Sequence, residues 1–120
     1  MTTRRTTASQ FVSVLESAFL RAMAEPARLE ILGVLLLHGP ADVSTIADEV
    51  PQERSVVSRH LKLLLDAGIL VVRREGRRRV YAVDGQSILR RFERILEEAR
   101  SLAQDCCPVP LARKGRKGMR

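Results

Sequence analysis

The sequence is poor in aromatic residues and in cysteine. Only 3% of its 120 residues are aromatic, tryptophan is absent, and the two cysteines are adjacent, at Cys106 and Cys107. We therefore expect an aliphatic core. A relaxed disulfide needs Cα atoms about 4.4–6.8 Å apart, whereas neighbouring Cα atoms lie only about 3.8 Å apart. The cysteines cannot form a disulfide framework, and a reducing, cytoplasmic setting is the simplest interpretation.

The chain also lacks long apolar runs and recognisable catalytic motifs. No window approaches the roughly 18 consecutive apolar residues of a membrane span, and residues 1–10 contain no apolar segment of a secretory signal. Glycine-rich phosphate loops, Ser-His-Asp arrangements and paired carboxylates are missing. The two histidines, His38 and His60, have no second ligand at metal-binding spacing. We therefore predict a protein that is neither an enzyme nor membrane-bound.

The basic residues are concentrated in two places. The net charge is +7, from 21 Lys and Arg against 14 Asp and Glu. Five of the basic residues lie in residues 113–120, and five arginines lie in residues 73–79. A local excess of this kind indicates a defined surface for nucleic acid rather than general attraction to polyanions.

The middle of the chain predicts a helix followed by a hairpin. Apolar residues recur at helical spacing over residues 53–67, and Gly68 follows as a stop signal. The opposite face of this helix carries Ser55, Ser58, Arg59 and Lys62. Two β-prone runs, residues 69–72 and 80–83, then flank the arginine-rich segment, which contains Gly76.

This combination of helix and hairpin suits DNA. A helix fits the major groove, where Ser and Arg can bond base edges, and a cationic hairpin tip can bond phosphate or enter the minor groove. The predicted contacts are Ser55, Ser58, Arg59, His60 and Lys62 from the helix and Arg77, Arg78 and Arg79 from the hairpin. His60 could instead serve packing. The alternatives are an ordinary solvated helix face and arginines that only blunt an exposed hairpin.

Four further helices are expected. They span residues 9–24, 26–38, 43–50 and 86–104. Pro26 is typical of a helix start, and Asp42 of a helix cap. The helix that begins at Pro26 is apolar nearly all round, so we expect it to be buried on several sides. The next, short helix and the polar-faced helix after it form a helix-turn-helix, which the hairpin completes as a winged helix.

The predicted fold class is therefore mainly α with a small β-hairpin: four helices, two strands and a last helix. The two terminal helices exceed what one small core needs, so we expect a homodimer formed through them; packing on their own core is the alternative. Residues 9–105 would form the domain. Residues 1–8 would be a flexible N-terminus, and residues 106–120 would hold the cysteine pair and a disordered basic tail.

Cys106 and Cys107 lie just beyond the last predicted helix, directly before Pro108. Consecutive side chains of a helix diverge by about 100°. A residue that precedes proline is pushed out of helical geometry, so Cys107 can turn back beside Cys106. Two converging thiols select soft, thiophilic ions. The alternatives are two incidental residues at a fraying helix end and a pair that responds to oxidants.

The chain resembles the ArsR/SmtB family of small bacterial repressors over about residues 11–104. Residues 24–32, Ala-Glu-Pro-Ala-Arg-Leu-Glu-Ile-Leu, look like the second helix of that family. Residues 55–64 and 67–70 look like its recognition helix and the entry to its wing, and residues 73–81 look like the wing. The resemblance implies a dimeric winged-helix repressor that binds double-stranded operator DNA and needs no cofactor.

Members of this family differ in the inducer that they sense. One type has a Cys-x-Cys box before the turn, and residues 43–48 contain no thiol. Another type binds zinc at the last helix. The matching positions here are Asp84, Gln86, Glu97 and Arg100. Three of these four depart from good zinc ligands.

A third type carries a vicinal cysteine pair at the end of the last helix and responds to trivalent arsenic or antimony. Cys106 and Cys107 match this type. The resemblance thus implies that methylarsenite, arsenite or antimonite, bound at the pair, releases the protein from DNA. The rival interpretations are a winged-helix repressor that senses thiol oxidation and a winged-helix module that binds DNA or protein without an inducer.

Overall fold

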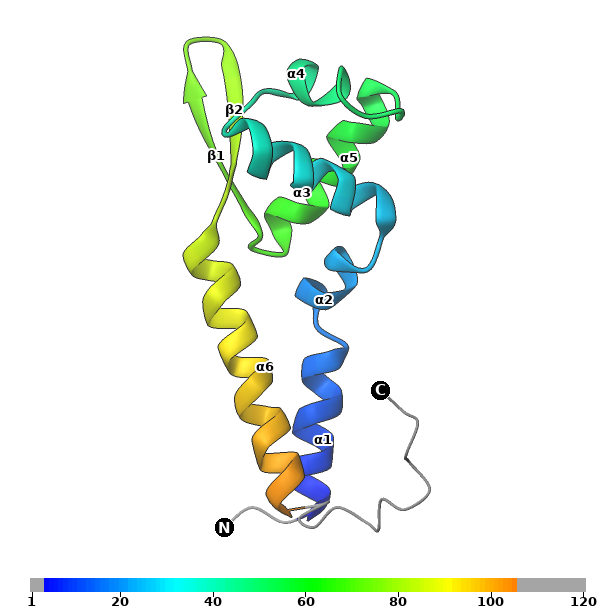
Figure 1. Cartoon of the computed structure of the whole chain (residues 1–120), viewed down its shortest axis with the longest axis vertical. Coiled ribbons are helices and arrows are strands. Elements are labelled where there is room, and N and C mark those ends of the chain that lie inside the picture. The colour runs from blue at the N-terminus through cyan, green and yellow to red at the C-terminus, as the bar shows by residue number, and fades with distance from the viewer. Residues whose placement is uncertain (1–3, 106–120) are drawn as a thin grey trace, which may run out of the picture. The chain divides into compact units, whose positions relative to one another are not determined.

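The computed structural model describes residues 4–105, so the cysteine pair and the basic tail lie outside the described residues. The chain divides into two compact units, one of residues 16–92 and one that combines α1 with α6 from residue 93 onward. In order, the elements are α1 Arg4–Leu15, α2 Ala18–Met23, α3 Pro26–His38, α4 Val43–Ala47, α5 Arg54–Asp66, β1 Leu70–Glu75, β2 Arg78–Val83 and α6 Gly85–Asp105 (Figure 1).

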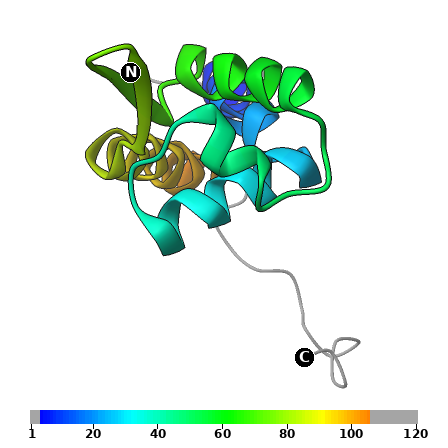
Figure 2. The same cartoon turned by 90° about the horizontal axis from the view of Figure 1, so that it is seen from above.

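An aliphatic core joins the helices of the larger unit, as predicted. The buried side chains are Ile31, Leu32 and Leu35 of α3, Ile46 of α4, and Val57, Leu61 and Leu64 of α5. Complete burial of such a side chain contributes about 1.5–3 kcal/mol. Helix α5 leads directly into the hairpin, and the two lie next to each other when seen from above (Figure 2). The winged helix-turn-helix architecture is therefore confirmed.

The residues predicted to begin or end helices lie at the helix ends where they were expected. Pro26 begins α3, which has the predicted bounds. The carboxylate of Asp42 accepts a hydrogen bond from the Thr45 N–H at 3.0 Å and thereby caps α4. Gly68 follows α5 with a φ of 79°, a left-handed conformation that favours glycine.

The hairpin is longer than the two apolar runs predicted. Its antiparallel register runs from Leu70 opposite Val83 to Glu75 opposite Arg78, and Gly76 at the tip has a φ of 65°. An isolated bridge joins Ala41 to Tyr81 through N–H···O bonds of 3.0 and 2.8 Å. This bridge ties the segment before α4 to β2.

The first predicted helix, residues 9–24, has the wrong extent. Helix α1 begins at Arg4, so residues 4–8 are helical instead of forming a flexible N-terminus. The chain then leaves helical geometry at Ser17, whose ψ is 154° and whose hydroxyl accepts a hydrogen bond from the Leu20 N–H at 3.3 Å. Because Ser17 caps a separate helix, five helices precede the hairpin instead of four.

Helix α3 is covered on one side only. Ile31 and Leu35 are buried, whereas Leu36 and Leu37 are 65% and 87% exposed. The prediction that this helix is buried on several sides is therefore wrong within the single chain. Helix α3 therefore carries more apolar side chains than the core of one chain buries.

In the smaller unit, α1 and the later part of α6 meet at a buried polar residue. Thr7 is 0% exposed, and its hydroxyl donates to Oδ2 of Asp105 at 2.9 Å. Val12 and Leu15 of α1 are 50% and 47% exposed, and Leu96 of α6 is 50% exposed. Both helices therefore carry apolar surface that the described chain does not cover.

Replacing Gly68 by Ala should destabilise the larger unit. A Cβ at this positive φ is strained and would lie 2.5 Å from Nη2 of Arg91. We expect the free energy of unfolding in urea to fall by about 1–2 kcal/mol. Gly33→Ala, inside α3 with nothing within 4 Å of the added Cβ, is the control and should raise it by about 0.5–1 kcal/mol. Equal effects of the two changes would contradict this account.

Candidate nucleic-acid interface

Helix α5 has an apolar buried face and a polar exposed face. Val57, Leu61 and Leu64 are at most 1% exposed. The exposed face carries Ser55, Ser58, Arg59 and Lys62. Their spacing of three, one and three residues brings them onto one side of the helix. The predicted grouping of these four side chains is confirmed, and their contact with DNA stays a prediction.

The two cations of this face are available to an anionic partner. Within residues 4–105, Arg59 has no carboxylate at ion-pair distance. Lys62 lies 3.4 Å from Asp66, but both side chains are more than 60% exposed. Such an exposed pair is worth only about 0.2–1 kcal/mol, so a phosphate can replace the carboxylate at little cost.

His60 differs from the four residues of the exposed face. It is half-buried, and its Nδ1 lies 3.3 Å from Nη1 of Arg28. A guanidinium can only donate, so Nδ1 accepts and the ring proton of neutral His60 is on Nε2. This geometry favours the packing role for His60.

Arg28 has a structural role beside this surface that the sequence analysis missed. Its Nε donates to the carbonyl of Ala22 at 2.9 Å, and its Nη2 donates to the carbonyl of Arg21 at 3.3 Å. With His60, these bonds connect the end of α2, the start of α3 and the middle of α5. A cation in the first turn of a helix opposes the helix dipole. This unfavourable position was the feature of the sequence that could have indicated a specific role for Arg28.

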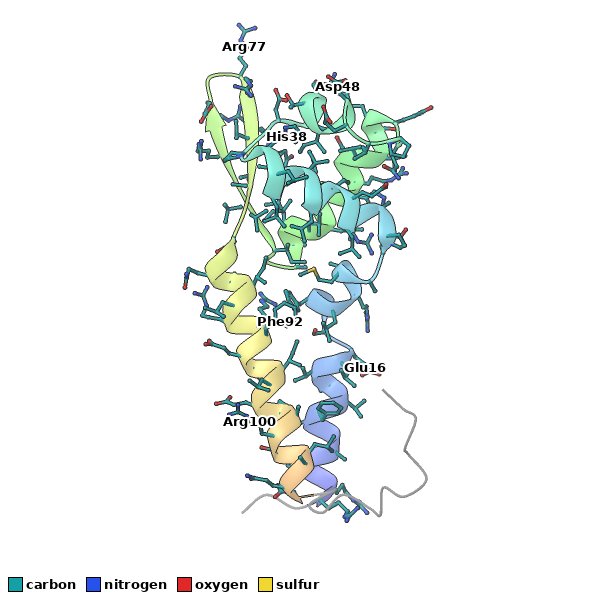
Figure 3. The ribbon with its side chains drawn as sticks, in the orientation of Figure 1. Glu16, His38, Asp48, Arg77, Phe92 and Arg100 are labelled. Atoms are coloured by element: carbon teal, nitrogen blue, oxygen red, sulfur yellow. The ribbon has the colours of Figure 1, made fainter. Side chains whose placement is uncertain are left out.

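The three predicted wing arginines have different surroundings. Arg77 projects from the hairpin tip (Figure 3), and no ion pair holds it within the described part of the chain. Arg79 stacks over the ring of Tyr81, 5.7 Å from its centroid. Arg78 is held by two carboxylates, at 3.0 Å from Asp42 and 3.8 Å from Glu75. Arg77 is therefore the best placed to reach a phosphate.

Asp42 connects the wing to the helix-turn-helix. Its Oδ1 caps α4 through Thr45, and its Oδ2 accepts from Nε of Arg78 at 3.0 Å. The hydrogen bonds from Thr45, followed by the bond and charge of Arg78, lower the pKa of Asp42 to about 2. The ionised carboxylate thus holds the hairpin against the start of α4 at neutral pH.

The described residues contain no metal-binding cluster. No group of three or more His, Cys, Asp or Glu gathers anywhere in residues 4–105. Asp84, one of the zinc-type positions, instead accepts a hydrogen bond from the Ser87 N–H at 3.1 Å at the start of α6. No helix in the same part of the chain is long and apolar enough to cross a membrane.

Comparison with known proteins matches a region that runs from the end of α2 into β1 and contains α5. Residues 23–73 match the family described as "Helix-turn-helix domain". The probable mercury resistance operon repressor of Streptomyces lividans is 32% identical over 91 residues, which cover 74% of this chain and 72% of that protein. Two regulators of Mycobacterium tuberculosis are 41% identical over 64 residues, and the chain spans only 52% and 59% of their length.

Solved structures with the same architecture extend over most of the chain. One, of a possible transcriptional regulator for arsenical resistance, is 28% identical, with a TM-score of 0.58 over 78% of this chain and 97% of that chain. Another is the homodimeric winged helix-turn-helix domain Mb0332 of Mycobacterium bovis, a possible ArsR-family regulator. It is 27% identical, with a TM-score of 0.58 over 87% of this chain and 93% of that chain.

The role of Asp42 predicts a specific pH dependence. Because folding lowers its pKa to about 2, the stabilisation is present above about pH 4 and is lost as the pH falls towards 2. Asp42→Asn keeps a capping side chain but loses the charge, whereas Asp42→Ala loses both. We expect both variants to melt below the wild type at pH 7, Ala the lower, and the gap between Asn and wild type to close towards pH 2. A gap that does not change with pH would contradict this assignment.

Proposed function

Because the chain belongs to the ArsR/SmtB family of winged-helix transcriptional regulators, we propose that it is a dimeric repressor that trivalent arsenic releases from its operator DNA. The observation that carries the proposal is the exposed row Ser55, Ser58, Arg59 and Lys62 on a helix whose other face is locked in the core. The inducer site is the pair Cys106 and Cys107.

The reading surface combines two elements of the larger unit. Helix α5 presents short hydroxyls and two cations, a mixture that can bond base edges in the major groove. The wing presents Arg77 at its tip, and the Asp42–Arg78 pair holds the hairpin beside the helix-turn-helix. Base contacts from α5 and phosphate contacts from the wing would together give specific binding.

Dimerisation would use the apolar surface of the terminal helices. Leu89, Phe92 and Leu96 recur at helical spacing on α6 and are each about half exposed, at 49%, 48% and 50%. Val12 and Leu15 add similarly exposed surface on α1. The related Mb0332 domain is a homodimer. A two-fold dimer would place two α5 helices on half-sites one turn of DNA apart.

The proposed inducer chemistry requires no oxidant or reductant. In methylarsenite, As(III) carries one methyl and two hydroxyl groups. Each thiol of Cys106 and Cys107 replaces one hydroxyl, and the thiol proton leaves with that hydroxyl as water. Two As–S bonds form, two As–O bonds break, and the third valence stays on carbon. Inorganic arsenite would keep one hydroxyl or take another ligand.

Trivalent arsenic fits this chain better than zinc. Vicinal thiols favour soft ions, and the structure of a possible regulator for arsenical resistance is among the similar folds. Residues 4–105 offer no cluster of zinc ligands. Mercury, the ion in the name of the Streptomyces relative, is a soft ion of the same class and belongs in the test beside arsenic. A thiol-redox repressor and an inducer-independent module remain the alternatives.

Arg59→Ala should weaken specific DNA binding by about 1–3 kcal/mol, because it removes a guanidinium that has no ion pair within residues 4–105 from the centre of the exposed row. The measurement is fluorescence anisotropy of the reduced protein on labelled DNA from its own promoter, with a scrambled duplex for comparison. Arg90→Ala, an exposed arginine on α6, removes the same charge and should have little effect. Equal losses from both changes, or equal affinity for both duplexes, would contradict the assignment.

The same assay tests the inducer. Methylarsenite and arsenite should release the wild type, and Cys106→Ser together with Cys107→Ser should abolish release without changing DNA affinity. Zinc should have no effect, and mercury measures selectivity within the soft ions. Binding that no ion disturbs would rule out the proposed site. Release by mild peroxide alone, with a subunit-bridging disulfide on a non-reducing gel, would establish the redox alternative.

A further inference from the structure

We propose that the outer face of α3 is a docking surface for a second protein, which presents a basic amphipathic helix to it. This face consists of Leu29, Gly33, Leu36 and Leu37, and all four residues lie in the larger unit. The inference goes beyond the proposed function, because it concerns a partner other than DNA and does not depend on the inducer.

The outer face of α3 is a contiguous apolar row. Leu29, Leu36 and Leu37 are 46%, 65% and 87% exposed. Leu29 and Leu36 are seven residues apart, and Gly33 is four residues from both Leu29 and Leu37. This spacing brings the four residues onto one side of the helix. Single exposed leucines are common on protein surfaces, whereas a group of them on one face marks a site of interaction.

Gly33 gives this row a shape that suits a helix. A Cβ added at Gly33 would meet nothing within 4 Å, so the row has an open space between Leu29 and the two leucines that follow. When two helices pack, a large side chain of one enters the space between four residues of the other. Peptides that dock as amphipathic helices use apolar anchors at this same spacing. A helix of the partner therefore fits the outer face.

The charge of this region favours a basic partner. Residues 22–53 hold six acidic residues and one basic residue, Arg28, although the net charge of the whole chain is +7. The Arg28 guanidinium is engaged with two backbone carbonyls and with His60. Within residues 4–105, Arg28 has no carboxylate at ion-pair distance. The acidic residues of this segment therefore keep an excess of negative charge.

Three of these acidic side chains are exposed and lie around the apolar row. Glu25 lies at the start of α3, and Glu30 lies beside Leu29 on the helix surface. Glu49 lies at the other end of the helix, where its carboxylate is 3.8 Å from Nε2 of His38. Lysines or arginines that flank the apolar face of the partner helix would meet these carboxylates.

A second copy of this chain is a poorer occupant than a basic partner. A two-fold contact through the outer face would bring the same acidic side chains of both copies together, and like charges across an interface are unfavourable. Figure 2 shows α3 and α5 on different sides of the larger unit. A partner bound to α3 therefore leaves the exposed row of α5 accessible to DNA.

The test uses a synthetic helical peptide of about 15 residues, with leucines on one face and lysines on the other. Calorimetry with the full chain should show one peptide bound per protomer. Leu36→Gln and Leu37→Gln should each weaken binding about tenfold. Both side chains are exposed, so the melting temperature and the DNA affinity should stay as in the wild type. Val71→Gln, at a 48% exposed valine of β1, is the control and should change nothing.

The charge requirement has its own variants. Glu30→Gln combined with Glu49→Gln should weaken binding of the lysine peptide and reduce its dependence on salt. Glu93→Gln combined with Glu97→Gln, at two exposed acids of α6, makes the same change of charge and should have no effect. A second peptide, with glutamate in place of every lysine, should bind at least about tenfold more weakly than the first.

Several results would overturn the proposal. They are no binding of the lysine peptide, equal binding of the two peptides, or equal losses from Leu37→Gln and Val71→Gln. Sedimentation of the protein alone gives a further test, because self-association that Leu37→Gln abolishes would assign the face to a second copy. Displacement of the lysine peptide by a peptide of residues 108–120 would assign the face to the basic segment of this chain. Either assignment would replace the proposed partner.

Discussion

Burial of one face of α5 is the constraint on which the rest of the structure depends. Val57, Leu61 and Leu64 are enclosed by the larger unit, and rotation of the helix by one residue, about 100°, would bring polar side chains into that core. The hydrophobic effect therefore fixes which residues face outward before any polar contact forms. Ser58 and Arg59 owe their position to their neighbours in the sequence more than to bonds of their own.

Polar contacts then fix how the surrounding elements meet this helix. Arg28 joins the end of α2 to His60 on α5, and Asp42 joins α4 to the wing through Arg78. At the start of α6, the Arg91 guanidinium lies over the ring of Phe19, and Phe92 meets the same ring edge-on, with centroids 5.3 Å apart. Four of the helices that these contacts join, α2, α3, α4 and α5, have 13 residues or fewer and would be marginal alone.

The sequence predicted the structure best where the residues that begin and end a helix flank the same segment whose apolar residues form the core. Apolar spacing, Pro26 and Gly68 placed α3 and α5 to within one residue of their observed bounds. The break at Ser17 was missed because apolar residues continue across it at helical spacing, while a single hydroxyl decides the backbone. Pairs such as Arg28–His60 and Asp42–Arg78, 32 and 36 residues apart, follow only from the packed structure. The geometry separates the eight residues predicted to contact DNA, because His60 contacts Arg28 and Arg78 pairs with Asp42 and Glu75.

The carboxylates around Arg78 have a consequence for the ionic atmosphere of the complex. Each phosphate neutralised by a free cation displaces close to one condensed counterion from duplex DNA. Arg78 is already paired with the carboxylates of Asp42 and Glu75. When it binds DNA it exchanges a carboxylate for a phosphate, and it therefore displaces fewer counterions than a free cation does. The number of arginines in the hairpin therefore overstates how steeply binding depends on ionic strength. The wing therefore contains many arginines, but its attraction for DNA phosphates comes mainly from Arg77 and the few neighbouring arginines that have no ion pair within residues 4–105.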